Sequence, residues 1–213
     1  MLRKLYSNYD VFMKFLGYDL QMGRFIQDLD LNGMKECRIL DVGCGTGTLG
    51  LRLLKRFPGS KLISTDIQER FLHGITKKRR KEGISREKIS TGILDVSRPE
   101  MIKFLDDTPS RLEEESFDII SIGGVIGYSK DHKKTLKRLL RLTRPGGYII
   151  DLEMNNGPVG KYIARRYHYE TPEADEMKRF IEKGGHEFSR VPIPAKYFPI
   201  NLTREGMIIR KKG

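Results

Sequence analysis

Short apolar runs alternate with longer amphipathic stretches along most of the chain. Five runs are strand candidates, and all but the third are nearly continuously apolar, as is typical of strands buried on both faces of a sheet: residues 38–42, 61–65, 88–93, 118–122 and 148–152. Helical periodicity predicts helices between them, at residues 49–56, 68–82 and 133–143. This alternation predicts βαβ units, and therefore a parallel sheet with helices on both faces.

Both ends of the chain depart from that alternation. Two further strand candidates, at residues 186–192 and 206–211, are joined by a proline-rich stretch without a helix, so we expect an antiparallel pair. A threonine, a proline and an acid at 171–173 are typical of the start of a helix that runs to Gly184. Near the other end, apolar residues at helical spacing predict one or two helices packed on the sheet: Leu2, Leu5, Tyr9, Phe12, Met13 and Leu16.

These patterns predict one fold class. We expect an α/β fold with a doubly wound, mostly parallel seven-stranded sheet, one reversed strand near the C-terminus, and helices on both faces. A chain of 213 residues has the length of a single domain. We divide that domain into an N-terminal helical cap (1–36), a core (37–153), a helical segment (154–185) and a terminal strand pair (186–213).

The composition narrows the class of protein. With two cysteines, Cys37 and Cys44, the chain has neither a disulfide framework nor a four-cysteine zinc site, so we expect no metal and a reducing, cytoplasmic setting. We expect no signal peptide, and no stretch approaches the roughly 20 apolar residues of a membrane-spanning helix. The formal charge of +12 indicates attraction to RNA or an anionic membrane, or only a solvated basic surface.

The clearest local signal is a glycine-rich turn directly after the first predicted strand. Gly43, Gly45 and Gly47 alternate there, on either side of Cys44 and just after Asp41. Glycine is needed where φ is positive or where a ligand lies against the backbone. Because open α/β sheets bind ligands at the carboxyl ends of their strands, this turn predicts a ligand site.

Two cofactor classes compete for this turn. Residues 45–50 also match GxGxxG, and Asp66 lies at the distance of a ribose-binding carboxylate, as in dinucleotide-binding proteins. However, a carboxylate at Asp41 would repel a diphosphate, whereas it would attract the cationic amine of a methionine moiety. We therefore favour a sulfonium nucleoside over a dinucleotide.

Residues 41–47, DVGCGTG, resemble the first motif of class I (Rossmann-like) S-adenosylmethionine (SAM)-dependent methyltransferases. Four later segments resemble further motifs of that family in the same order: residues 64–67, 94–96, 117–124 and 142–148. The resemblance covers about residues 9–152 and implies SAM as cofactor. The cofactor-binding residues that it implies are Asp41, Gly43, Cys44, Gly45, Gly47, Asp66, Ile67, Asp95, Val96 and Gly123. By the same resemblance, Asp66 binds the ribose hydroxyls and Asp95 the adenine amine.

No general base follows from the sequence. The weak candidates for a catalytic role are Tyr128, for which packing is the alternative, and His132, for which we favour a solvated helix start because nothing pairs it with an orienting partner. Residues 161–169 carry three tyrosines and three basic residues, and they fit either an acceptor pocket or a surface helix. A sulfonium methyl is already activated, so the enzyme chiefly orients the reactants, and a base is optional.

Three interpretations remain for the acceptor. Residues 9–13 are similar to methyltransferases of quinones, phospholipid headgroups and other small molecules, so we favour a small-molecule or lipid-like acceptor. The basic runs at 77–81 and 130–141 fit an RNA methyltransferase, and the basic, apolar leading segment fits an anionic membrane surface. The third interpretation is a SAM-binding subunit without catalysis. Residues 123–126 lack an Asn-Pro-Pro-Tyr-like motif, which argues against methylation of adenine or glutamine amides.

Overall fold

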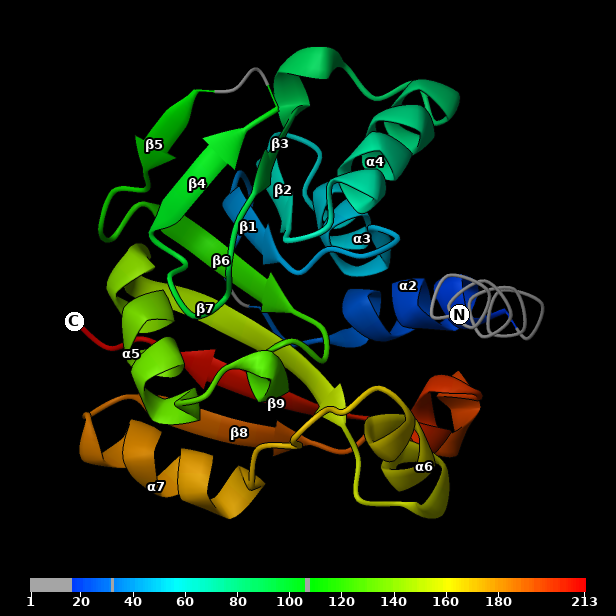
Figure 1. The fold of residues 1–213 in the computed structure, drawn as a ribbon, viewed down its shortest axis with the longest axis vertical. Coiled ribbons are helices and arrows are strands. Elements are labelled where there is room, and N and C mark those ends of the chain that lie inside the picture. Colours follow the sequence, from blue (N-terminus) through cyan, green and yellow to red (C-terminus); the bar gives the residue numbers. More distant parts are fainter. Residues whose placement is uncertain (1–16, 32, 106–107) are drawn as a thin grey trace.

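The computed structural model describes residues 17–31, 33–105 and 108–213, and within them the strands form one sheet (Figure 1). The strands are β1 (Arg38–Val42), β2 (Lys61–Asp66), β3 (Ile89–Ile93), β4 (Met101–Phe104), β5 (Pro109–Arg111), β6 (Phe117–Ile122), β7 (Thr143–Met154), β8 (Glu187–Val191) and β9 (Arg204–Arg210). The helices are α2 (Tyr18–Asp28), α3 (Thr48–Arg56), α4 (Glu69–Lys81), α5 (His132–Leu142), α6 (Pro158–Arg166) and α7 (Ala174–Lys183).

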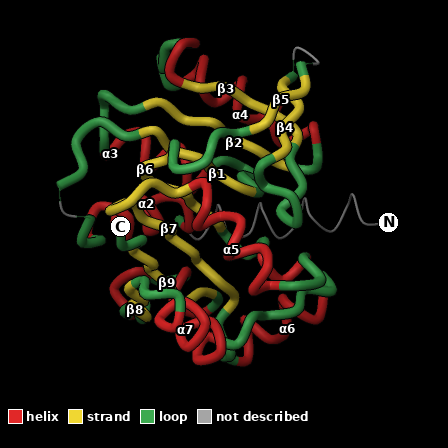
Figure 2. Tube along the Cα trace, turned by 90° about the vertical axis from the view of Figure 1, so that its left-hand side faces the viewer, coloured by secondary structure: helices red, strands yellow, loops and turns green. Residues whose placement is uncertain are grey.

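The strand order is β5-β4-β3-β2-β1-β6-β7-β9-β8, and β3 and β8 lie toward opposite ends of the molecule in Figure 2. The neighbours from β3 to β7 pair in parallel. β9 pairs antiparallel with both β7 and β8, which confirms the predicted reversed strand near the C-terminus. The doubly wound α/β class expected from the alternating pattern is therefore confirmed.

A layer of hydrophobic side chains from the helices covers each face of the sheet. Ile119 and Ile150 are fully buried against α2, α3 and α4, whereas Ile120 and Ile149 are fully buried against α5 and α7. Because consecutive residues of a strand point to opposite faces, a sheet covered on both sides needs continuous apolar strands. This is why the central strands were recognisable from the sequence.

The structure differs from the sequence prediction at three places. The described residues form nine strands rather than seven, because β4 and β5 add an antiparallel hairpin beyond β3. Helix α7 begins at Ala174 with Glu173 as its cap, and the predicted proline start at Pro172 stays extended. The proline-rich stretch between β8 and β9 holds two short 3-10 helices, Ala195–Tyr197 and Ile200–Leu202, where none was predicted. Such single turns are common connectors and leave no periodic pattern.

The predicted N-terminal helices fall partly outside the described residues. Leu2, Leu5, Tyr9, Phe12, Met13 and Leu16 belong to residues 1–16, which are not described. The described part of the cap is α2, whose buried residues Met22, Phe25 and Ile26 join the core beside α3. In the described ranges, no helix combines the length and the apolar character that crossing a bilayer requires.

Candidate active site

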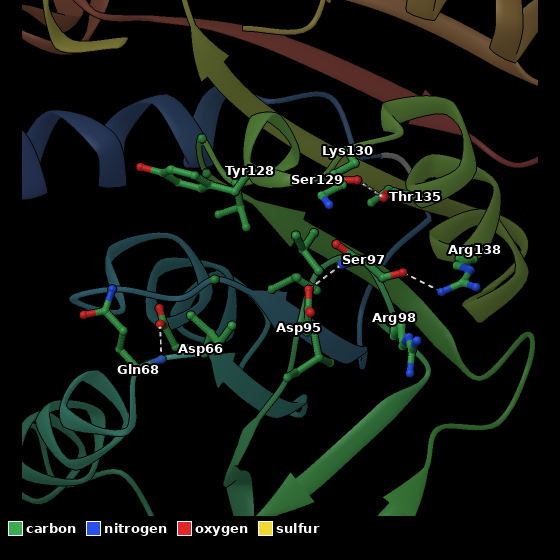
Figure 3. Close-up of a pocket in the computed structure, with 18 of the residues that line it drawn as sticks. Asp66, Gln68, Asp95, Ser97, Arg98, Tyr128, Ser129, Lys130, Thr135 and Arg138 are labelled. Carbon is green, nitrogen blue, oxygen red and sulfur yellow. Dashed lines mark hydrogen bonds between the residues drawn. The ribbon is translucent and has the colours of Figure 1, made fainter. Parts of the chain in front are cut away.

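A cavity of about 740 Å³ lies at the carboxyl ends of β1, β2, β3 and β6 (Figure 3). The segments that follow these strands form its walls, as expected for an open α/β sheet. Of the residues predicted to bind cofactor, those that line the cavity are Gly43, Asp66, Ile67, Asp95, Val96 and Gly123. Those that do not line it are Asp41, Cys44, Gly45 and Gly47.

The glycine turn after β1 has a left-handed backbone at three positions. Gly43, Gly45 and Gly47 have φ values of 67°, 49° and 76°, which side chains rarely tolerate. A Cβ on Gly43 would lie 2.3 Å from a methyl of Val125, and a Cβ on Gly47 would lie 2.1 Å from Ile75. A Cβ on Gly45 would meet no atom within 4 Å. Two of these glycines therefore make room for the protein's own side chains, and Gly45 faces open space.

Cys44 lies in the same turn but has no reactive environment. Its side chain is buried, and burial together with the charges of Asp41 and Asp66 raises the pKa of its thiol. A thiol held in its protonated form is a poor nucleophile. Cys44 is therefore a small, buried turn residue.

Asp41 lies beneath the turn, with 1% of its surface exposed. The Ser121 hydroxyl donates a hydrogen bond to Asp41 Oδ1 at 2.7 Å, and a Cβ on Gly50 would lie 2.5 Å from Asp41 Oδ2. Burial raises the pKa of Asp41 to about 6, against the lowering effect of the Ser121 hydrogen bond. Asp41 thus links β1 to β6 and to the start of α3, and its direct contact with a ligand amine stays a prediction.

Asp66 connects the glycine turn to α4 and forms part of the cavity wall. Its Oδ2 accepts a hydrogen bond from the Gly45 amide at 3.0 Å, and its Oδ1 accepts one from the Gln68 amide at 2.8 Å. Burial raises the pKa of Asp66, and these two amides oppose that rise. Each carboxylate oxygen can accept a second hydrogen bond, so both can still bind a hydroxyl.

Asp95 also lines the cavity, two residues after the end of β3, the strand that pairs with β2. Its Oδ1 accepts a hydrogen bond from the Ser97 amide at 2.8 Å, so Asp95 also stabilises a local turn. The sequence did not assign the basic outer part of the cavity to the site. That part includes Arg98, Lys130 and Arg138 (Figure 3). The sequence signal for Lys130 and Arg138 was the basic cluster at residues 130–141, which the sequence alone did not connect to the segment after β3 that carries Arg98.

Tyr128 and His132, the two catalytic candidates, have different positions. Tyr128 lines the cavity with 53% of its surface exposed, in a short 3-10 helix at Ile126–Tyr128. Its ring packs edge to face against Tyr169, with centroids 5.0 Å apart. His132 is the first residue of α5 and does not line the cavity. The arrangement favours Tyr128 and leaves His132 as a helix-start residue.

A buried polar network supports the segment that carries Tyr128. The Tyr169 hydroxyl accepts a hydrogen bond from the Gly127 amide at 3.0 Å and donates one to the Glu153 carboxylate. Glu153 and Asp151 lie on the same face of β7, and burial raises the pKa of both carboxyls. Two acids in the apolar run of β7 were the sequence signal for this network, and the sequence prediction missed it.

Arg204 of β9 lies beside this network, near the end of β6. Its Nη1 donates a hydrogen bond to the Leu152 carbonyl and its Nε donates one to the Tyr18 hydroxyl, both at 3.3 Å. The guanidinium covers Gly124, where a Cβ would lie 2.2 Å from Nη1. Its charge lowers the pKa values of Asp151 and Glu153, against the effect of burial. The network therefore combines a guanidinium, two carboxyls and two tyrosines, which lie behind Gly124 and Gly127 and do not line the cavity.

Comparison with known proteins gives a consistent result. A family model described as a methyltransferase domain matches residues 40–149. A demethylmenaquinone methyltransferase of Thermus thermophilus is 30% identical over 166 residues, which cover 76% of this chain and 68% of the relative. A second protein of that name, from Leptospira interrogans, is 23% identical over 214 residues, which cover 99% of this chain and 80% of the relative.

Solved structures share the fold at low sequence identity. The CurJ carbon methyltransferase superposes with a TM-score of 0.66 at 16% identity, over 86% of this chain and 50% of that chain. An O-methyltransferase family protein from Burkholderia thailandensis superposes with a TM-score of 0.68 at 13% identity, over 90% of this chain and 55% of that chain. This chain thus spans about half the length of both.

Proposed function

Because the chain belongs to the class I SAM-dependent methyltransferases, we propose that it methylates a small, quinone-like acceptor at the Tyr128 end of the cavity. The observation that carries the acceptor class is the 30% identity to a protein named demethylmenaquinone methyltransferase, over 76% of this chain. The cavity is consistent with such an acceptor, because acidic, apolar and aromatic side chains are among those that line it. An RNA acceptor gains no support from these relatives.

The residues around the glycine turn fit SAM. Asp66 offers two carboxylate oxygens, each already oriented by a backbone amide, for the ribose hydroxyls. Asp95 lies on the wall beyond it, in reach of the same cavity, for the adenine amine. Ile67 lies between these two acids in the chain and lines the cavity with 64% of its surface exposed, which suits contact with a flat ring. When bound, SAM supplies a methyl group already activated by its positive sulfur.

On the acceptor side, the chain chiefly offers orientation. The Tyr128 side chain is exposed, and the ring of Tyr169 packs edge to face against it. A planar aromatic acceptor would gain about 0.5–1.5 kcal/mol from such a contact beyond the area that it buries. Correct orientation of two reactants is worth roughly 7–11 kcal/mol of barrier, so no further catalytic side chain is required by the proposal.

The test is methyl transfer from labelled SAM to three acceptors: a prenylated 1,4-naphthohydroquinone with a free ring position, phosphoethanolamine, and total RNA. We expect label in the naphthohydroquinone alone, and loss of labelling in Asp66→Asn. Calorimetry with SAM and with NAD first establishes that the protein binds cofactor. Label in RNA or phosphoethanolamine, with none in the naphthohydroquinone, would refute the proposed acceptor class while leaving the family assignment intact.

A further inference from the structure

A second hollow, of about 530 Å³, lies between the C-terminal ends of α5 and α7. It shares no lining residue with the cofactor cavity. In Figure 1, α5, α7 and the C-terminus lie together on the side away from the arrowheads of β6 and β7. The hollow therefore lies at the opposite edge of the sheet from the proposed methyl transfer, and its residues need a separate explanation.

The wall of this hollow is basic and includes no acidic residue. Two of its cations have partners outside the wall: Arg141 pairs with Glu114, and Lys211 Nζ lies 2.9 Å from a carboxylate oxygen of Glu115. The remaining two, Lys137 and Lys183, are exposed and have no side-chain partner among the described residues. The hollow thus carries two positive charges that the protein does not compensate.

The floor of the hollow is apolar. It is formed by Leu140 of α5 and Phe180 of α7, which belong to the hydrophobic layer on this face of the sheet. A volume of about 530 Å³ falls within the range of roughly 300–1,000 Å³ typical of small-molecule pockets. An apolar floor below cationic side chains is complementary to a molecule with an apolar body and a negative head.

His186 adds a polar atom to the wall. Its Nδ1 is buried and has no hydrogen-bond partner in the described structure. Burial and the charge of Lys211 lower the pKa of His186, so its ring is neutral at pH 7. With the proton on Nδ1, that atom can donate a hydrogen bond to an anion. A buried donor without a partner is unfavourable, and a ligand that accepts its hydrogen bond would remove that cost.

We propose that this hollow binds a single anionic amphiphile, whose apolar body contacts Leu140 and Phe180 and whose carboxylate or phosphate head binds Lys137 and Lys183. Lys183 lies in the last turn of α7, where a cation also compensates the helix dipole. That effect does not account for Lys137, which lies in the middle of α5, or for the apolar floor. The combination of charge and apolar surface is what a fatty carboxylate or alkyl phosphate requires.

The experiment is calorimetry of the intact protein with dodecyl phosphate below its micelle concentration, with dodecanol and inorganic phosphate as comparison ligands. We expect dodecyl phosphate to bind at least tenfold more tightly than either. The double variant Lys137→Gln/Lys183→Gln should lose at least tenfold in affinity. The matched control Lys61→Gln/Lys77→Gln removes the same charge from exposed lysines elsewhere and should change the affinity less than twofold.

Two results would overturn the proposal. One is an equal loss of affinity in the test and control variants, which would show that binding of dodecyl phosphate depends only on the net charge of the protein. The other is failure of dodecyl phosphate to bind while the protein binds phosphatidylglycerol vesicles equally well with and without Lys137 and Lys183. Because dodecyl phosphate binding requires no methyl transfer, either result is independent of the proposed acceptor. SAM affinity should be the same in all these proteins and serves as the folding control.

Discussion

Burial of the Asp41 carboxyl should make the stability of this protein depend on pH in an identifiable way. Asp41 is 1% exposed and lies between β1, Ser121 and Gly50, and its pKa in the folded protein is about 6. In the unfolded chain the same carboxyl should titrate near its ordinary value of 3.8. The substitution Asp41→Asn removes the titration and keeps an oxygen that can accept the Ser121 hydrogen bond.

The sign follows from the number of protons bound. Between pH 3.8 and about 6, the folded protein holds a proton on Asp41 and the unfolded chain does not, so folding is favoured as the pH falls. The separation of the two pKa values corresponds to about 3 kcal/mol when the pH is below both, of which about 2 kcal/mol is reached by pH 4. Above about pH 7 both states are ionised and this contribution is constant. Wild type should therefore gain about 2 kcal/mol relative to Asp41→Asn between pH 7 and pH 4.

The assay is urea unfolding of both proteins at pH 7, 6, 5 and 4, monitored by circular dichroism. The quantity of interest is the difference between the two free energies of unfolding at each pH. Asp151 and Glu153 also have raised pKa values, but they are present in both proteins and cancel in that difference. A constant difference from pH 7 to pH 4 would show that Asp41 is not buried as described, whatever the stability of the variant at a single pH.

Three further predictions concern the turn and the polar network. Asp66→Asn should weaken SAM binding more than tenfold, or about 1.4 kcal/mol, and calorimetry showing wild-type affinity would exclude Asp66 from the site. Gly43→Ala should lower the unfolding free energy more than Gly45→Ala, because both residues have a left-handed φ but only the Cβ at Gly43 would lie 2.3 Å from Val125; equal stability losses in the two would contradict this reasoning. Tyr169→Phe should destabilise by about 1–3 kcal/mol, since it leaves two buried partners unpaired, and an unchanged urea midpoint would argue against the network.

The parts of the fold that were predictable are those in which local sequence and tertiary structure impose the same pattern. The apolar runs of β1 and β6 follow directly from burial on both faces. The hairpin of β4 and β5 was missed because its strands are three and four residues long and half exposed at the sheet edge, so they have no apolar pattern to detect. The start of α7 was misplaced because a proline at 172 fits the first turn of a helix and an extended segment equally well.

The candidate site was predictable where one motif contains both the residue and its environment. Asp66 and Asp95 directly follow strands, so the strand prediction alone brings them to the cavity edge. The burial of Asp41 was not predictable from the motif, because it depends on Ser121, which is 80 residues away. The role of Gly43 likewise depends on Val125, which no local pattern connects to the turn. The glycines of this turn meet three different requirements: a left-handed backbone, room for neighbouring side chains, and room for a ligand. Their spacing in the sequence does not distinguish these requirements, whereas the contacts in the structure do.

Some residues at or near the cofactor cavity and the second hollow depart from ordinary packing rules. Ile67 and Tyr128 are large side chains left exposed on the cofactor cavity, and Asp151 and Glu153 are acids buried in β7, where Glu153 supports the Tyr128 segment through Tyr169. Burying two neighbouring carboxyls costs free energy that apolar residues would not, so stability alone does not explain them. Natural sequences tolerate such costs mainly where function requires them. In the second hollow, His186 Nδ1 is a buried polar atom without a partner among the described residues, and the ligand that we propose there would supply one.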